Sequence, residues 1–196
     1  LFGIFDEDMV CGIHAEMRRR GVRLYFRADV TGFAREEDCI VTELGDGTKL
    51  RSDMVVLAIG VKPDAVLAER AGIKLGPRGG ICVNAKMETS AKDVYAVGDA
   101  IEVTDFVSGQ PALIALAGPA NKQGRIAADN ICGLSSEYKG TQGSSVIKLF
   151  GMTAAATGMT EKRARAAGLN FGKVIVSPAN HASYYPGARA MTIKVL

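Results

Sequence analysis

The sequence predicts an α/β fold, and three observations support this. Met54–Ile59 is apolar at every position, which is typical of a parallel-sheet strand covered by helices on both faces. From Pro119 to Ile131, small and apolar residues recur at helical spacing, which indicates a helix that packs closely against its neighbour. Val94–Val97 is a second apolar, strand-like run, and it stops at Gly98-Asp99, as strands of open α/β sheets do where they meet a ligand site.

The first part of the chain contains one helix and several short strands. Acidic residues at Asp6–Asp8 suit the positive end of a helix dipole, and Arg18–Arg20 suit the negative end. Gly21 can then adopt the left-handed conformation that ends the helix. Strands are expected at Val22–Phe26 and Val30–Phe33, a hairpin at Cys39–Leu44 and Thr48–Ser52, and a short helix at Asp64–Ala71.

The second part begins after a linker-like stretch, Gly76–Gly80. A buried strand is expected at Val94–Val97, and it stops at the dipeptide Gly98-Asp99. After the helix near Pro119, the remaining residues predict a ββαββ unit whose helix starts at an N-capping Thr160. Its elements are expected at Ser145–Phe150, Thr153–Thr157, Glu161–Ala167, and near Val174 and Met191. Directly after the linker-like stretch, a short strand is also expected at Ile81–Val83.

Composition excludes several classes of function. The chain has 196 residues, and 24 basic against 21 acidic side chains leave a net charge of +3, too little for nucleic-acid binding to be the leading idea. Its longest apolar run is far shorter than a membrane span. The four cysteines are too widely separated for a CxxC redox or zinc pair, and two histidines do not favour a metal site. Buried thiols in the cytoplasm, a reducing compartment, are expected.

Gly98 and Asp99 form the first candidate for a ligand site. Open α/β sheets bind ligands at the carboxyl ends of their strands, where these residues are expected. Gly98 allows a ligand to approach the backbone, and the Asp99 carboxylate can accept a hydrogen bond from a sugar-like hydroxyl. The alternative is an ordinary turn, for which Gly-Asp is a common dipeptide.

A second glycine-containing loop follows at Leu116–Arg125 and leads into the expected helix. Pro119 suits the first helical position, and the unpaired amides of a helix N-terminus form an electropositive pole. Directed at a flavin, this pole would stabilise negative charge on the reduced ring. The alternative is an ordinary packed helix of small residues.

Four segments together resemble the pyridine nucleotide-disulfide oxidoreductases, in particular the coenzyme A-disulfide reductase and NADH oxidase branch. They are Asp53–Pro63, Thr89–Ala100, Leu116–Arg125 and His181–Gly187. The resemblance implies parts of two dinucleotide-binding domains followed by part of an α+β interface domain that dimerises. Residues 1–80 would be the C-terminal part of the NAD(P)H-binding domain, 81–144 the C-terminal part of the FAD-binding domain, and 145–196 the N-terminal part of the interface domain.

The resemblance also implies roles for individual residues. Tyr184 and Tyr185 would reach the active site of the partner subunit, where a phenolic hydroxyl can donate to a thiolate; without the resemblance they would be a surface turn. Asp99 would bind the ribityl chain of FAD. The residues expected to bind cofactor are Gly60, Gly98, Asp99, Leu116, Ala117, Gly118, Pro119, Ala120 and Asn121.

The implied parent is an FAD-dependent enzyme that passes hydride from NADH or NADPH through flavin and a redox cysteine. Its acceptor would be a disulfide such as coenzyme A disulfide, a persulfide, a peroxide or oxygen, and it would be a homodimer. This chain has no GxGxxG motif and no cysteine in the redox motif, so we expect an inactive fragment that does not hold cofactor well by itself. The alternative is a non-catalytic interaction or dimerisation module; a nucleotide-binding regulatory domain is disfavoured by the absence of a phosphate loop.

Overall fold

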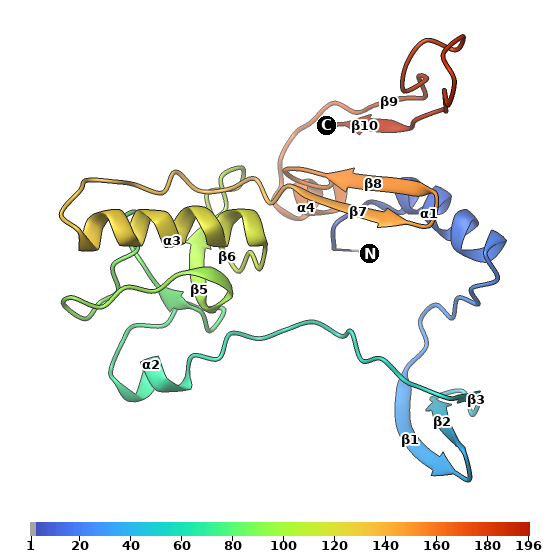
Figure 1. Ribbon diagram of the computed structural model, residues 1–196, viewed down its shortest axis with the longest axis horizontal. Coiled ribbons are helices and arrows are strands. Elements are labelled where there is room, and N and C mark those ends of the chain that lie inside the picture. Colours follow the sequence, from blue (N-terminus) through green and yellow to red (C-terminus); the bar gives the residue numbers. More distant parts are fainter. Residues whose placement is uncertain (1–2) are drawn as a thin grey trace. The chain divides into compact units, whose positions relative to one another are not determined.

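A computed structural model describes residues 3–196 (Figure 1). Its α-carbon contacts divide the chain into two compact units. The smaller unit is Met17–Val61, and the larger contains the residues up to Glu16 together with Lys62–Leu196. The domain boundaries expected near residues 80 and 144 stay predictions.

The smaller unit is a three-stranded antiparallel sheet in the order β1-β2-β3. The predicted hairpin is confirmed: its turn places Gly47 at φ +85°, and the Thr48 amide donates to Asp46 Oδ1 at 2.9 Å. The strand expected at Val22–Phe26 is absent, because this segment has no strand partner and Arg27 adopts a turn conformation at φ +54°. The strands are β1 (Val30–Glu36), β2 (Cys39–Leu44) and β3 (Lys49–Ser52).

The prediction of a buried strand at Met54–Ile59 is wrong. This segment belongs to no strand, and its apolar side chains are exposed except for the partly buried Val55, with Ile59 90% exposed. A strand requires a neighbour for its backbone hydrogen bonds. None of the described residues pairs with this segment.

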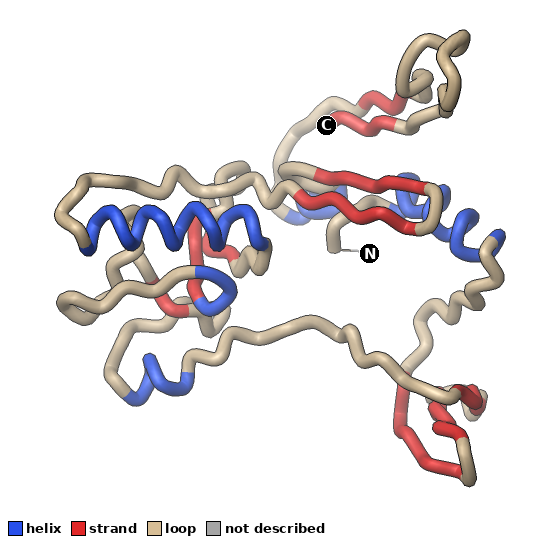
Figure 2. Tube along the Cα trace, viewed as in Figure 1, coloured by secondary structure: helices blue, strands red, loops and turns tan. Residues whose placement is uncertain are grey.

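A buried apolar cluster of the larger unit is formed by residues from a small mixed sheet, a helix and a neighbouring loop. Figure 2 shows the backbones of this helix and these short strands. Strand β5 pairs parallel with β4 and antiparallel with β6. Ala127 of helix α3 packs with Met87, Ile101 and Val103 in the buried cluster. The elements are α2 (Val66–Arg70), β4 (Ile81–Cys82), β5 (Ile101–Thr104), β6 (Pro111–Ala112) and α3 (Ala117–Ile131).

The strand predicted at Val94–Val97 is also wrong. Tyr95 forms only an isolated bridge with Glu88, and the turn η1 (Gly98–Ala100) follows directly. The strand in this region is β5, after Gly98-Asp99 rather than before it. Two hydrogen bonds, Thr89 N to Val94 O at 2.9 Å and Ala96 N to Met87 O at 3.1 Å, form this bridge, and the pairing extends no further. Strand β5, in contrast, gains a parallel partner and buries Ile101.

The C-terminal section has the ββαββ order that the sequence predicts. Strands β7 and β8 pair antiparallel, as do β9 and β10, and the Thr160 hydroxyl accepts from the Arg163 amide at 3.3 Å at the start of α4. The helix predicted after Asp6 is α1 (Glu7–Arg19), followed by Gly21 at φ +82°. The remaining elements are β7 (Ser145–Leu149), β8 (Met152–Ala156), α4 (Glu161–Ala166), β9 (Val174–Val176) and β10 (Ile193–Val195).

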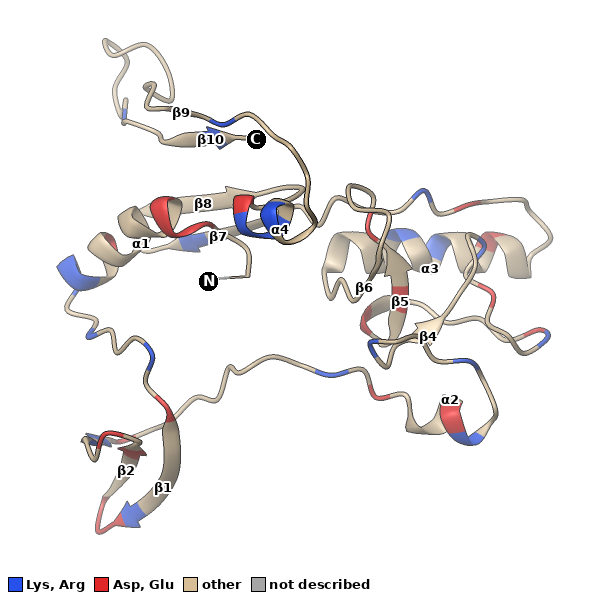
Figure 3. Ribbon diagram, turned by 180° about the vertical axis from the view of Figure 1, so that it is seen from behind, with Lys and Arg blue, Asp and Glu red and all other residues tan. Residues whose placement is uncertain are grey.

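An ionic cluster joins the start of α1, the start of α4 and strand β10 (charged residues in Figure 3). The Lys194 ammonium lies 3.1 Å from Asp6, 2.8 Å from Asp8 and 2.7 Å from Glu161, and its side chain is 5% exposed. Asp6 also accepts from the first two amides of α4, Glu161 N at 2.9 Å and Lys162 N at 3.1 Å. A carboxylate at a helix N-terminus stabilises that end of the helix.

This cluster predicts a loss of stability in acid. Hydrogen bonds from Lys194, Arg165 and Lys173 lower the pKa of Glu161 from 4.5 to about 2. Burial raises the pKa of Asp6, but hydrogen bonds from the Glu161 and Lys162 amides outweigh it, so that this pKa also lies below its usual value. A lowered pKa means that the folded state stabilises the charged carboxylate. The contribution of Glu161 to the free energy of unfolding is therefore complete above pH 4.5 and is lost as the pH falls through about 2.

Urea unfolding at a series of pH values from about 6 to about 2, which span the titration, would measure this loss. We expect Glu161→Gln to have a smaller loss than the unmodified chain. Glu137→Gln is the control, because Glu137 is exposed and the structure gives it no ion pair among the described residues. Equal acid sensitivity in Glu161→Gln and the unmodified chain would contradict the prediction.

Candidate functional site

The candidate site begins at the Gly98-Asp99 turn, which contacts helix α3. Gly98 has φ +78°, a conformation that favours glycine, and a β-carbon added there would come no closer than 3.9 Å to Ala120. Its amide donates to the side-chain oxygen of Gln123 on α3 at 2.8 Å. The next residue, Asp99, is exposed, so its carboxylate is available to a ligand.

The N-terminus of α3 supplies the second part of the site. Leu116 is the extended N-cap residue, and no side chain caps the helix. The sequence predicted Pro119 as the first helical residue. It is instead the third, because the helix begins two residues earlier, at Ala117. Pro119 is tolerated there because the first amides of a helix have no intrahelical acceptor. The same rule leaves the Ala117 and Gly118 amides available to an anionic or carbonyl group.

The structure therefore brings most of the predicted cofactor-binding residues together. Gly98 and Asp99 lie beside α3, which contains or adjoins the residues from Leu116 to Asn121. The Asn121 side chain is already engaged, donating to the Ala117 carbonyl at 2.9 Å. Gly60, at φ +101°, belongs to the smaller unit, and its role stays a prediction.

This arrangement suits FAD. An exposed carboxylate can bind sugar-like hydroxyls, and uncapped helix amides can face an electron-rich ring edge. A β-carbon added at Gly118 would meet nothing within 4 Å, so the backbone here is open. Within the described residues, no group of three or more His, Cys, Asp or Glu side chains is arranged to hold a metal ion.

Tyr184 and Tyr185 lie on the long loop between β9 and β10. They are 84% and 58% exposed, and their ring centroids are 5.2 Å apart. His181 makes an edge-to-face contact with Tyr185 at 6.0 Å. Asn180 closes the base of the loop, because its amide donates to the Arg189 carbonyl at 2.9 Å and its side chain accepts from the Arg189 amide at 2.8 Å.

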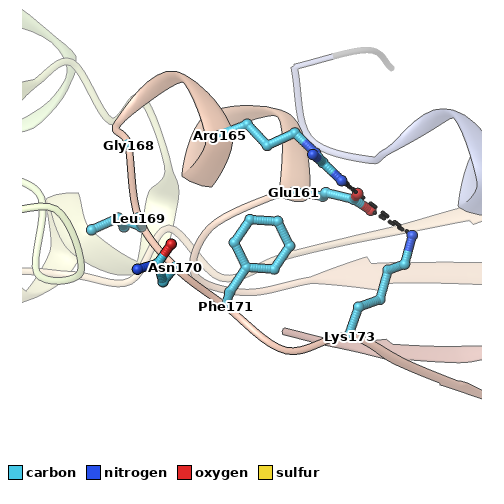
Figure 4. Close-up of a pocket in the computed structure, with 7 residues that line it drawn as sticks. All are labelled: Glu161, Arg165, Gly168, Leu169, Asn170, Phe171 and Lys173. Atoms are coloured by element: carbon cyan, nitrogen blue, oxygen red, sulfur yellow. Dashed lines mark hydrogen bonds and ion pairs between the residues drawn. The ribbon is translucent and has the colours of Figure 1, made fainter.

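A separate cavity of about 550 Å³ lies beside the C-terminal end of α4 (Figure 4). Its charged side chains are engaged with one another: Glu161 pairs with both Arg165 and Lys173, as the dashed lines show. Arg165 also lies 5.6 Å from the centre of the Phe171 ring. Since each of these charged groups already has a partner in the cavity wall, we assign no ligand here. The lining residues are Glu161, Arg165, Gly168, Leu169, Asn170, Phe171 and Lys173.

Gln123 is a site residue that was not predicted from the sequence. This residue is 2% exposed and is the only α3 side chain for which the described structure gives a hydrogen bond to the Gly98-Asp99 turn. One feature of the sequence could have indicated it: Gln123 is a polar residue between Ala120 and Ala127, on the face of the helix that is expected to be buried, where a polar side chain needs a hydrogen-bond partner.

Comparison with known proteins identifies the family. The family model described as pyridine nucleotide-disulphide oxidoreductase matches residues 1–124. The chain belongs to this family. Membership confirms the family and the partial α/β flavoprotein fold that the sequence predicts. None of the helices in the described part of the chain is long and apolar enough to cross a membrane.

Two relatives illustrate the range of functions within the family. The chain is 33% identical to an NAD(P)H sulfur oxidoreductase (CoA-dependent) of Pyrococcus furiosus, and 32% identical to an NADH oxidase of Methanocaldococcus jannaschii. Each alignment covers 97% of this chain and 42% of the relative. The chain thus spans about two fifths of the length of these relatives.

Solved structures agree with this relationship. An NAD-dependent persulfide reductase from A. fulgidus matches with a TM-score of 0.94 at 34% identity, covering 97% of this chain and 35% of that chain. Reduced Bacillus anthracis CoADR-RHD matches with a TM-score of 0.92 at 43% identity, covering 97% and 34%. Neither the domain boundaries nor the individual site residues are established by these matches, and both stay predictions.

Proposed function

We propose that this chain is part of an FAD-dependent oxidoreductase that transfers reducing equivalents from NAD(P)H to a sulfur acceptor. The observation that carries the proposal is the exposed Asp99 carboxylate next to the uncapped N-terminus of α3. Family membership supports it, as do relatives named for sulfur oxidoreductase and persulfide reductase activities.

In this proposal, the chain's own residues bind and orient the flavin. The Asp99 carboxylate accepts hydrogen bonds from the ribityl hydroxyls, and Gly98 keeps the backbone clear of the ligand. The Ala117 and Gly118 amides face the electron-rich edge of the ring, where the positive helix pole favours negative charge. When bound, FAD supplies the hydride chemistry, and the protein contributes position and electrostatics.

The proposed acceptor is a disulfide or persulfide of coenzyme A. Tyr184 and Tyr185 would donate their phenolic hydrogens to a thiol substrate in the active site of a second copy, which makes the enzyme a homodimer. Their exposure and the closed base of their loop support this role. The four cysteines are unpaired, which supports a reducing, cytoplasmic location. The expectation that these thiols are buried is wrong, because Cys11 and Cys132 are exposed and Cys39 and Cys82 are only partly buried. By itself, the chain is expected to be inactive, because it contains no GxGxxG motif.

The test is a spectrum and an activity assay of the purified full-length enzyme. We expect the absorbance band at about 450 nm that is typical of flavins. Under anaerobic conditions, NADH or NADPH should bleach this band, and coenzyme A disulfide or persulfide should restore it. Restoration by oxygen alone, with no turnover of either sulfur compound, would instead favour an oxidase, the activity for which the Methanocaldococcus jannaschii relative is named. A colourless enzyme that takes up no added FAD would exclude the proposal.

A further inference from the structure

Gln123 is a buried polar side chain that joins the two parts of the candidate flavin site, the Gly98-Asp99 turn and helix α3. Its side-chain oxygen accepts from the Gly98 amide at 2.8 Å, and the residue is 2% exposed. A buried amide side chain without a partner is costly, because water cannot replace the missing hydrogen bond. This contact is therefore a fixed feature of the packing between α3 and the turn.

The position of this contact gives it a particular consequence. On one side, Gly98 directly precedes Asp99 and has a positive φ that its neighbours must hold. On the other side, Gln123 belongs to the same rigid helix as the Ala117 and Gly118 amides. One hydrogen bond thus connects the segment that presents the carboxylate to the helix that presents the free amides.

We propose that Gln123 is a positioning residue for the flavin: its side-chain carbonyl holds the Gly98-Asp99 turn at the distance from the α3 N-terminus that FAD requires. This inference rests on the proposed function. It assigns Gln123 no contact with FAD or with the reacting atoms, since the residue acts through Gly98.

Asn130 offers a matched control on the same helix. Its side chain donates to the carbonyls of Ile126 and Ser136, both at 2.8 Å, and so also joins α3 to a loop. It lies about two helical turns beyond Gln123, and the structure gives it no hydrogen bond to Gly98. A purely structural role for Gln123 predicts that the two positions behave alike, whereas a positioning role predicts that they differ.

The experiment compares three variants of the full-length enzyme. Gln123→Met keeps the shape of the side chain but removes the acceptor, Gln123→Glu keeps an acceptor, and Asn130→Leu removes the polar contacts of the control residue. The measurements are the dissociation constant for FAD added to the apoprotein, the thermal midpoint, and hydrogen exchange at the Gly98 amide. We expect Gln123→Met to weaken FAD binding by about tenfold and to accelerate exchange at Gly98.

Gln123→Glu should retain the slow exchange at Gly98, which keeps the test valid if Gln123→Met does not fold. Asn130→Leu should lower the thermal midpoint while FAD affinity stays within about twofold of the wild type. Equal losses of FAD affinity in Gln123→Met and Asn130→Leu would overturn the inference, as would unchanged exchange at Gly98 in Gln123→Met. If the wild type itself binds no FAD, the proposed function fails and the inference fails with it; if only the variants contradict expectation, the proposed function stands.

Discussion

Replacing Lys194 by methionine is expected to lower the free energy of unfolding by about 3 kcal/mol. Lys194 is the shared cation of Asp6, Asp8 and Glu161, and its side chain is 5% exposed. Methionine fills a similar volume but removes the cation that Asp6 and Asp8 share. Glu161 keeps its ion pairs with Arg165 and Lys173. Removing one partner of a buried ion pair costs more than replacing the whole pair by apolar groups. Urea unfolding followed by far-ultraviolet circular dichroism would measure the change.

Lys173→Met is the matched control for this prediction. Lys173 also pairs with Glu161, at 3.1 Å, but its side chain is 42% exposed, and exposed ion pairs contribute little to stability. We therefore expect a much smaller effect than at Lys194. If the two variants unfold at the same urea concentration, the burial of Lys194 does not increase its contribution to the free energy of unfolding, and the prediction is wrong.

Replacing Asp99 by alanine is expected to weaken FAD binding by about tenfold or more, the effect of losing a hydrogen bond to a charged group. Asp99 is exposed and lies on the η1 turn, so the thermal midpoint of the apoprotein should change little. Asp99→Asn keeps an acceptor oxygen but removes the charge, and we expect an intermediate affinity. Titration of apoprotein with FAD, followed by the change in flavin fluorescence, would measure all three proteins.

Asp38→Ala controls for the loss of one negative charge. Asp38 is an exposed carboxylate next to the start of β2, in the smaller unit, and it has no proposed role. Its substitution should leave FAD affinity within about twofold of the wild type. If Asp99→Ala also stays within that range, Asp99 does not bind the flavin and the geometric basis of the proposed function is lost.

The sequence predicted best the elements that depend on local chemistry. The β2–β3 hairpin follows from the Gly45–Gly47 turn, and the α4 N-terminus from the Thr160 cap; both signals lie within a few residues of the element that they define. The strands expected at Met54–Ile59 and Val94–Val97 failed for the opposite reason. An apolar run indicates that a segment favours burial, but pairing also requires a neighbour, which the run itself does not specify.

The residues of the candidate site also fall into those that local sequence motifs predict and those that depend on distant partners. Gly98, Asp99 and the start of α3 were found from short motifs, although the strand was placed on the wrong side of Gly98-Asp99. Gln123 could not be found in this way, because its role depends on a hydrogen bond to a residue 25 positions away. The role of Lys194 depends on a partner, Asp8, that is 186 positions away. A buried polar residue can be suspected from sequence, but its partner is determined by the tertiary fold.

The sequence separations in the ionic cluster also have a consequence for the order of folding. Asp6 is synthesised before α4, and its two acceptor bonds to that helix span 155 and 156 residues. The ammonium group of Lys194, which completes the cluster, follows Glu161 by a further 33 residues. Contacts between residues so distant in sequence form slowly, because a long loop must close first. During translation, the start of α1 must therefore remain without its final partners until β10 has left the ribosome.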